Sequence, residues 1–316
     1  MFELVMLGTS ASAPSIYRGL PAQLLLAGDQ RFLIDCGEGT QRQILRSGVG
    51  FRNLNRVLLT HGHLDHILGL GGLMSTLTSW ENINEIEIWA GYYPLRRIHA
   101  LLFGVVLDYE RLPIDIRLRE LKPGLLLEEK AFVVTAFPVS HRGRGNFGFA
   151  FEQKAHRPFL VERAEALGIP AGPERRELVQ GRSVTLADGR LITPDMVLAP
   201  ALPGAKYVHI GDCARIDNLG AHVRDATALV IEATFLHEDV ETARAFGHLT
   251  AHQAALLASE NNVETLILTH VSRRYRERDI KQEARAVFPA TLLARDFDHF
   301  EIFRDRPVAR VRPDRK

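Results

Sequence analysis

The chain has 316 residues of ordinary globular composition, with 46% hydrophobic residues and a formal net charge of +1. This near-neutral charge excludes an overall basic surface of the kind that indicates a nucleic-acid partner. Two isolated cysteines, Cys36 and Cys213, exclude a disulfide framework. No uncharged apolar run approaches membrane-spanning length, and the first residues lack a signal-peptide pattern. We therefore expect a cytoplasmic protein with no membrane segment.

Short apolar runs separated by turn residues predict an α/β protein. In the first half we expect strands at Phe2–Leu7, Gln23–Ala27, Arg31–Ile34, Arg56–Leu59, Glu85–Ala90 and Phe132–Phe137, and helices at Gln41–Arg46 and Leu95–Val106. In the second half we expect strands at Tyr207–Ile210, Ala228–Glu232 and Thr265–Thr269, and a helix at Ala251–Asn261 that Thr250 caps.

The stretch His61-Gly62-His63-Leu64-Asp65-His66 places four potential metal ligands directly after a buried strand. Imidazole and carboxylate together suit zinc, manganese or iron. Adjacent Asp65 and His66 cannot easily point to the same place as His61 and His63. A strand end followed by a turn can aim the two pairs at two different cations, so the spacing predicts two metals rather than one.

Three further ligand candidates also follow strands: His141, Asp212 and His270. A lone histidine is more often structural, but these positions repeat the strand-terminal placement of His61. Asp212 is the candidate bridging ligand, because a carboxylate can offer one oxygen to each of two cations and an imidazole cannot. Arg274 and Tyr275 follow His270 closely and suit phosphate and base contacts, although a solvated loop is the alternative.

The hydrophobic pattern of the sequence changes between about residues 154 and 200. Periodicity weakens, and Gly168–Pro173 interrupts a short helical stretch. Gly/Pro density by itself indicates a linker. Because strands of one sheet are expected on both sides, we interpret this segment as an excursion from a single domain of residues 1–316.

The metal motif is the signature of the metallo-β-lactamase superfamily, and the chain from Gly8 to Tyr275 resembles its ribonuclease Z branch, the short form. The resemblance also covers Asp35-Cys36-Gly37-Glu38-Gly39-Thr40-Gln41, Glu232-Ala233-Thr234 and the His-x-Thr stretch from His248. It implies a four-layer αβ/βα sandwich and a zinc-dependent endoribonuclease that removes the 3′ trailer from precursor tRNA, leaving a 3′-hydroxyl on the tRNA and a 5′-phosphate on the trailer.

The resemblance implies two Zn²⁺ ions per subunit, although Mn²⁺ or another divalent metal could serve. It places His61, His63 and His141 on one metal, and Asp65, His66 and His270 on the other, with Asp212 between them. Such a pair, about 3.5–4 Å apart, activates a water and neutralises a phosphodiester.

The resemblance also implies three catalytic residues. Asp65 orients the nucleophile and is the general-base candidate, and His248 is the candidate proton donor to the leaving 3′-oxygen. Glu232 orients His248 by a hydrogen bond. Without the metal cluster, ordinary strand-end packing and helix capping would explain His248 and Glu232.

Residues 154–200 correspond to an arm that grips tRNA in this family, and Gly172 and Pro173 are the substrate-binding candidates there. The family also implies a homodimer. This sequence departs from the family pattern at Leu64, where Gly is usual, at Cys213, where Thr is usual, and at Leu249, where Ser is common. Leu64 is expected to alter the loop between ligands, but none of the three changes removes a ligand.

Three other interpretations stay open on the residues alone. One is a hydrolase for a small substrate, such as a cyclic phosphodiester, thioester or lactam, which would have no use for an arm. Another is a non-catalytic RNA-binding protein, which would normally have lost a ligand. The third is a purely structural protein, which leaves the clustering of ligands at strand ends unexplained.

Overall fold

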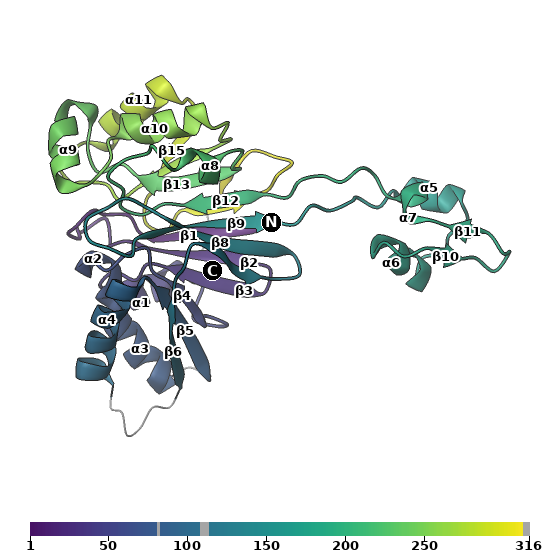
Figure 1. Ribbon diagram of the computed structural model, residues 1–316, viewed down its shortest axis with the longest axis horizontal. Coiled ribbons are helices and arrows are strands. Elements are labelled where there is room, and N and C mark those ends of the chain that lie inside the picture. The colour runs from purple at the N-terminus through teal and green to yellow at the C-terminus, as the bar shows by residue number, and fades with distance from the viewer. Residues whose placement is uncertain (81–82, 108–113, 312–316) are drawn as a thin grey trace. The chain divides into compact units, whose positions relative to one another are not determined.

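The computed structural model describes residues 1–80, 83–107 and 114–311 (Figure 1). The segment Gln153–Gly204 forms one compact unit, and the chain on either side of it forms another. No helix among the described residues combines the length and the apolarity needed to cross a bilayer.

Two large sheets form the centre of the larger unit. Among the described residues the first sheet has eight strands, in the order β17 (Ala309–Val311), β16 (His299–Ile302), β1 (Phe2–Gly8), β2 (Ala22–Ala27), β3 (Gln30–Ile34), β4 (Arg56–Leu58), β5 (Glu85–Ala90) and β6 (Asp115–Glu120). Pairing is antiparallel from β17 to β3 and parallel from β3 to β6.

The second sheet has seven strands within the described residues. Their order is β15 (Thr291–Leu293), β14 (Leu266–Thr269), β13 (Ala228–Glu232), β12 (Lys206–His209), β9 (Phe147–Gln153), β8 (Phe132–Pro138) and β7 (Gly124–Glu128). The four strands β12 to β15 are parallel to one another, whereas β9 runs antiparallel to β12.

Strand β1 shows how the core is built. Its residues alternate between two hydrophobic clusters, with Phe2, Leu4 and Met6 in one and Val5 and Leu7 in the other. The first cluster also contains side chains of the second sheet, so it fills the space between the sheets. This alternation follows from the two-residue period of a strand that is buried on both faces.

Helices cover the two outer faces (Figure 1). On the side of the first sheet these are α1 (Thr40–Ser47), α2 (Leu64–Ile67), α3 (Gly69–Trp80) and α4 (Tyr92–Leu101), followed by a π-helical turn, η1 (Leu102–Val106). On the side of the second sheet they are α8 (Gly220–Val223), a 3₁₀ turn η3 (His237–Asp239), α9 (Val240–Phe246), α10 (Ala251–Glu260) and α11 (Glu277–Val287). The larger unit is therefore a four-layer αβ/βα sandwich, which confirms the predicted fold class.

The smaller unit has a core of its own. Its elements are α5 (Val161–Ala166), α6 (Pro173–Val179), β10 (Val184–Thr185), β11 (Leu191–Ile192) and α7 (Pro194–Val197). Five of its side chains form a separate buried cluster: Ala164, Ile169, Leu178, Ile192 and Val197. The Gly/Pro-rich stretch is thus a folded unit and not a structureless linker.

Several predicted elements differ from those observed. The helix expected at Leu95–Val106 begins earlier, at Tyr92, and passes into the π-helical turn at Leu102. Pro94 lies in the first turn of α4, where its missing N–H costs no helical hydrogen bond. By contrast, Thr250 caps α10 as predicted, because its hydroxyl accepts a hydrogen bond from the amide of Gln253 at 3.2 Å.

Candidate metal centre and active site

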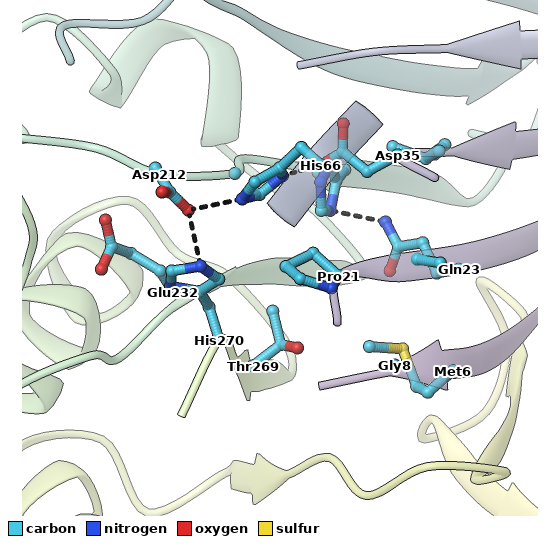
Figure 2. Close-up of a pocket in the computed structure, with 14 residues that line it drawn as sticks. Met6, Gly8, Pro21, Gln23, Asp35, His66, Asp212, Glu232, Thr269 and His270 are labelled. Atoms are coloured by element: carbon cyan, nitrogen blue, oxygen red, sulfur yellow. Dashed lines mark hydrogen bonds and ion pairs between the residues drawn. The ribbon is translucent and has the colours of Figure 1, made fainter. Parts of the chain in front are cut away.

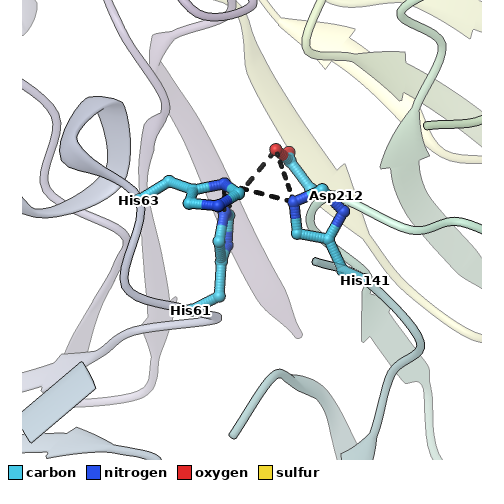
Figure 3. A group of neighbouring side chains, drawn as sticks. All are labelled: His61, His63, His141 and Asp212. Atoms are coloured by element: carbon cyan, nitrogen blue, oxygen red, sulfur yellow. Dashed lines mark hydrogen bonds and ion pairs between the residues drawn. The ribbon is translucent and has the colours of Figure 1, made fainter. Parts of the chain in front are cut away.

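Three histidines converge on one oxygen of Asp212 (Figure 3). His61 and His63 lie in the loop between β4 and α2, and His141 follows β8. Nε2 of His61 and Nε2 of His141 lie 3.0 and 3.2 Å from Nδ1 of His63. The same two Nε2 atoms lie 3.6 and 3.7 Å from Oδ2 of Asp212. We call these four residues the first ligand group.

The other oxygen of Asp212 faces a second set of side chains. Oδ1 lies 3.4 Å from Nε2 of His66 and 3.2 Å from Nε2 of His270 (Figure 2). Oδ2 of Asp65 lies 3.7 and 3.6 Å from the same two nitrogens. We call Asp65, His66, His270 and Oδ1 of Asp212 the second ligand group. The carboxylate of Asp212 therefore lies between the two groups.

Both groups fit a bound cation. Four ligand atoms arranged tetrahedrally about 2.0–2.1 Å from one zinc ion lie about 3.4 Å from one another. The separations above, from 3.0 to 3.7 Å, bracket that value. Nε2 of His66, Nε2 of His270 and Oδ1 of Asp212 are moreover buried without a hydrogen-bond partner in the described part of the chain. Buried polar atoms are rarely left unpaired, so these three indicate a divalent metal site.

The protonation states of Asp212, Asp65 and His61 suit metal binding. Burial opposes the charge of Asp212, but the surrounding imidazoles of His270, His66 and His61 hold the pKa of that carboxyl well below its usual value. Burial likewise opposes the charge of Asp65, yet the neighbouring imidazoles of His270 and His66 lower its pKa to about 2. Burial lowers the pKa of His61 well below its usual value, which favours the neutral ring that binds a metal. Burial opposes the charge of His66, but the carboxylates of Asp212 and Asp35 raise its pKa well above the usual value, so a cation would have to displace a proton there.

The ligand rings are oriented by groups behind them. Asp35 follows β3, and its Oδ2 lies 2.8 Å from Nδ1 of His66 and 2.9 Å from the hydroxyl of Thr60. That hydroxyl lies 3.0 Å from Nδ1 of His61. The carbonyl of Gly247 lies 2.7 Å from Nδ1 of His141. Each of these contacts fixes Nδ1 of a ligand histidine, so that Nε2 of the same ring faces its ligand group.

The candidate proton donor lies beside the first ligand group. His248 follows α9, and its Nδ1 lies 3.1 Å from both carboxylate oxygens of Glu232, the last residue of β13. The same nitrogen lies 3.9 Å from Oδ2 of Asp212. Burial disfavours a charged His248, but the neighbouring Glu232 carboxylate raises the pKa of this histidine to about 9. Glu232 itself is fully buried.

The predicted substrate-binding residues lie in both units. Arg274 stacks over the ring of Phe235 at 5.7 Å, and the Tyr275 ring lies 6.4 Å from the same ring. Phe235 in turn lies 6.1 Å from the His248 ring, so Arg274 and Tyr275 belong to the surroundings of the candidate donor. Gly172 and Pro173 lie in the smaller unit, where Pro173 is the first residue of α6.

Two departures from the family pattern have little effect on the ligands. Leu64 is the first residue of α2 and is half exposed, and Asp65 and His66 occupy the next two positions of the helix. Cys213 is fully buried, and its thiol donates to the carbonyl of Arg215 at 3.0 Å. Its backbone amide donates to Oε1 of Glu232 at 2.6 Å, a bond that any residue except proline could make at this position.

No role in the site was predicted for Asp35, Thr60 or Thr234. Asp35 was predictable in principle, because it follows a strand like the ligands do. Thr234 was not, since its partners Glu232 and His270 meet only through the parallel pairing of β13 with β14, in which Glu232 lies opposite Thr269.

The sequence is similar along nearly its whole length to proteins named ribonuclease Z. Such a protein from Bradyrhizobium sp. (strain ORS 278) is 49% identical over 302 residues, which cover 96% of this chain and 100% of that one. Another, from Archaeoglobus fulgidus, is 40% identical over 306 residues and covers 96% of this chain and 98% of its own. The family model described as anti-Pycsar protein Apyc1 matches residues 2–101.

Solved structures of the same fold agree. Human tRNase Z, short form, aligns with a TM-score of 0.67 at 24% identity, over 95% of this chain and 99% of that one. The metallo-β-lactamase fold protein YhfI from Bacillus subtilis aligns with a TM-score of 0.68 at 17% identity, over 94% and 98% of the two chains. The likeness to these structures shows the fold, and the sequence identity to the curated relatives shows the family: this chain belongs to the ribonuclease Z family.

Proposed function

We propose that this protein is a zinc-dependent endoribonuclease that removes the 3′ trailer from precursor tRNA. The observation that carries the proposal is the position of Asp212, with one oxygen facing each ligand group and His248 3.9 Å away. Two ligand groups that share a carboxylate suit two divalent cations, and nitrogen-rich groups of this kind suit Zn²⁺. Hydrolysis of a phosphodiester is one of the reactions that such a pair serves.

Each part of the site would contribute one role. When bound, the two cations would lower the pKa of a water molecule and neutralise the charge of the scissile phosphate. Asp65, ionised because of its low pKa, would accept a hydrogen bond from that water and orient it toward phosphorus. The backbone amide of Ser12 donates to Oδ2 of Asp65 at 3.1 Å and helps to fix this carboxylate.

His248 would protonate the leaving 3′-oxygen. Glu232 holds Nδ1, so Nε2 is the nitrogen left to donate its proton. The raised pKa keeps the ring protonated at neutral pH. Departure of the 3′-oxygen leaves a 3′-hydroxyl on the tRNA and a 5′-phosphate on the trailer.

The smaller unit would bind tRNA. It carries its own hydrophobic cluster, which a surface loop would not need. Gly172 caps α6 and Pro173 is its first residue, and the next four residues are charged: Glu174, Arg175, Arg176 and Glu177. Near the donor, the guanidinium of Arg274 and the ring of Tyr275 would contact phosphate and base.

We further propose a cytoplasmic homodimer, as the family resemblance implies. The exposed apolar side chains of Leu64 on α2, of Leu68 directly after it, and of Tyr92 and Tyr93 on α4 support the proposal that a second copy binds here. Light scattering after size-exclusion chromatography tests this directly, because one chain has a mass of 35.4 kDa.

A second candidate function is the hydrolysis of a small phosphodiester. The family model that matches residues 2–101 covers four of the seven candidate ligands, those from His61 to His66, and ends before the smaller unit. This function would need the ligand groups but not the smaller unit.

The test is cleavage of a 3′-extended precursor tRNA by Zn²⁺-loaded protein under single-turnover conditions. We expect cleavage near the discriminator base, its loss in Asp212→Ala, and a rate about 10²–10⁴-fold lower in His248→Ala. Lys130→Ala, in an exposed turn between β7 and β8, is the control and should cleave at the rate of the unmodified protein. Hydrolysis of bis(p-nitrophenyl) phosphate without any cleavage of the precursor would favour the second candidate.

A further inference from the structure

The side chain of Thr234 lies between the candidate proton donor and the second ligand group. Its hydroxyl oxygen is 2.5 Å from Oε2 of Glu232, which holds His248, and 2.9 Å from Nδ1 of His270. Thr234 is buried, as are Glu232 and His270. One hydroxyl thus touches both parts of the site, and none of the roles proposed above uses it.

The distances assign the hydrogen atoms in this chain of contacts. The Thr234 hydroxyl contacts two oxygens that can only accept, Oε2 of Glu232 at 2.5 Å and the backbone carbonyl of His270 at 3.1 Å, so its single hydrogen goes to the nearer one, Oε2. The hydroxyl oxygen can then accept, and Nδ1 of His270 must be the protonated nitrogen. Nε2 of His270 is left with its lone pair free, facing Oδ1 of Asp212 at 3.2 Å and Oδ2 of Asp65 at 3.6 Å.

We propose that Thr234 is a positioning residue that couples the Glu232–His248 pair to the second ligand group by fixing the tautomer and the orientation of His270. The inference rests on the roles proposed above for Glu232 and His270. It adds that the strength of cation binding in the second ligand group depends on the carboxylate of Glu232, which lies outside that group, and that this dependence passes through one hydroxyl.

The backbone of His270 restricts its ring further. His270 has a φ of 53°, in the left-handed region that a residue with a side chain rarely adopts. A ring held at one nitrogen on a strained strand end has little freedom to turn away from the ligand group.

The experiment measures Zn²⁺ affinity by competition with a chromophoric chelator, without RNA. Thr234→Val keeps the shape of the side chain and removes the hydroxyl, and Thr234→Ser keeps the hydroxyl. We expect Thr234→Val to weaken one of two Zn²⁺ equivalents about 10- to 100-fold, the usual effect of removing a group that orients a ligand, and Thr234→Ser to restore most of the loss. Thr269→Val is the matched control, because the hydroxyl of Thr269, next to His270, makes no hydrogen bond within the described residues.

A double-mutant cycle tests the coupling itself. Glu232→Gln should weaken the same Zn²⁺ equivalent when Thr234 is present and have no further effect in the Thr234→Val background. Equal losses from Glu232→Gln in both backgrounds would overturn the coupling, and so would two Zn²⁺ equivalents of unchanged affinity in Thr234→Val.

One measurement needs no variant and covers the case in which Thr234→Val does not fold. Nitrogen-15 NMR of the Zn²⁺-loaded, unmodified protein should show a proton on Nδ1 of His270 and the metal on Nε2. The opposite tautomer would overturn the proposal. If the protein cleaves precursor tRNA but shows either overturning result, only the role of Thr234 fails; if it binds no Zn²⁺ at all, the proposed function fails with it.

Discussion

Asp35 is not a ligand, but its contacts orient histidines in both ligand groups. It has a φ of 58°, an unusual conformation for a residue with a side chain, and its carboxylate accepts from the backbone amide of Thr60 at 2.8 Å. It also contacts His66, in the second ligand group, and Thr60, which contacts His61 in the first. A single carboxylate therefore orients one histidine of each group.

Replacing this carboxylate tests that dependence. In Asp35→Asn one oxygen can still accept from Thr60, but the amide nitrogen would face Nδ1–H of His66 with a second donor. We expect Zn²⁺ affinity to fall about 10- to 100-fold in a chelator competition. Asp29→Asn, in the exposed turn between β2 and β3, is the matched control. Unchanged affinity in Asp35→Asn would show that Asp35 serves the turn alone.

The seven candidate ligands could be selected from the sequence because each one closely follows a buried strand, and strand position is a local property. The residues that contact and orient these ligands could not be selected in the same way. Thr234 depends on the register between β13 and β14, and the contact of His141 depends on a carbonyl more than a hundred residues away, at Gly247. Such pairings are set by tertiary packing and leave no local pattern.

At the scale of elements, the close approach of α3 to the loop after β3 positions the motif from His61 to His66. The amide of Gly69, the first residue of α3, donates to the carbonyl of Cys36 at 2.9 Å, and the amide of Cys36 donates to the carbonyl of His66 at 2.8 Å. A Cβ atom on Gly69 would lie only 1.9 Å from the carbonyl oxygen of Gly37. No side chain fits there unless the two segments separate.

Gly69→Ala should therefore destabilise the fold and weaken the second ligand group together. We expect a loss of about 2–4 kcal/mol in the free energy of unfolding, because backbone atoms must move to admit the methyl group. Urea unfolding checks the magnitude. Gly104→Ala is the control, since a Cβ at Gly104 would meet nothing within 4 Å, and this variant should be as stable as the unmodified protein or slightly more so. Equal midpoints for the two variants would contradict the steric argument.

Some of the strands that were not predicted have simple physical reasons, although the long buried strand β9 was missed as well. Strands β6 and β7 expose most of their residues, so their hydrophobic signal is weak. Strands β15 and β17 have only three residues each, too few to establish a period. Long buried strands such as β1 and the capped helix α10 carried clear local signals and were predicted close to their observed bounds.

At the scale of the whole molecule, distant parts of the chain are joined by a charged cluster. Glu277, the first residue of α11, lies 2.6 Å from Arg18 through Oε1 and 2.6 Å from Arg295 through Oε2. Burial opposes its charge, but the hydrogen bonds from Arg295 and Arg18 lower the pKa of Glu277 below its usual value. The cluster ties the loop after β1 to α11 and to the loop before β16.

The pH dependence of stability follows from the sign of this shift. Because the folded chain has the lower pKa, the unfolded chain binds the proton more readily, and the stabilisation is present above the ordinary Glu range and lost as pH falls through the folded value. Glu277→Gln should cost about 1 kcal/mol near pH 7, and the difference should shrink toward about pH 4. Thermal unfolding at both pH values measures it; a difference that stays constant would rule out the charge as its origin.

The smaller unit can be removed as a piece, because its two ends are adjacent. A Cβ on Gly204 would lie 2.3 Å from the carbonyl oxygen of Gln153. Replacing residues 155–202 by a short Gly/Ser linker should leave Zn²⁺ binding and the hydrolysis of bis(p-nitrophenyl) phosphate intact, and should raise the KM for precursor tRNA roughly tenfold or more. An unchanged KM would show that the smaller unit does not bind the substrate.

The pairing of β1 has a consequence for how the chain is made. One edge of β1 is bonded to β2, and the other is bonded to β16, at residues 299–302. During translation, the backbone groups on this edge of β1 therefore stay unpaired until almost all of the described chain has left the ribosome. In nascent or prematurely terminated chains that end before β16, β1 would be the edge strand of the first sheet. Its unpaired backbone groups could pair with another chain and start aggregation, so chaperones would have to shield them.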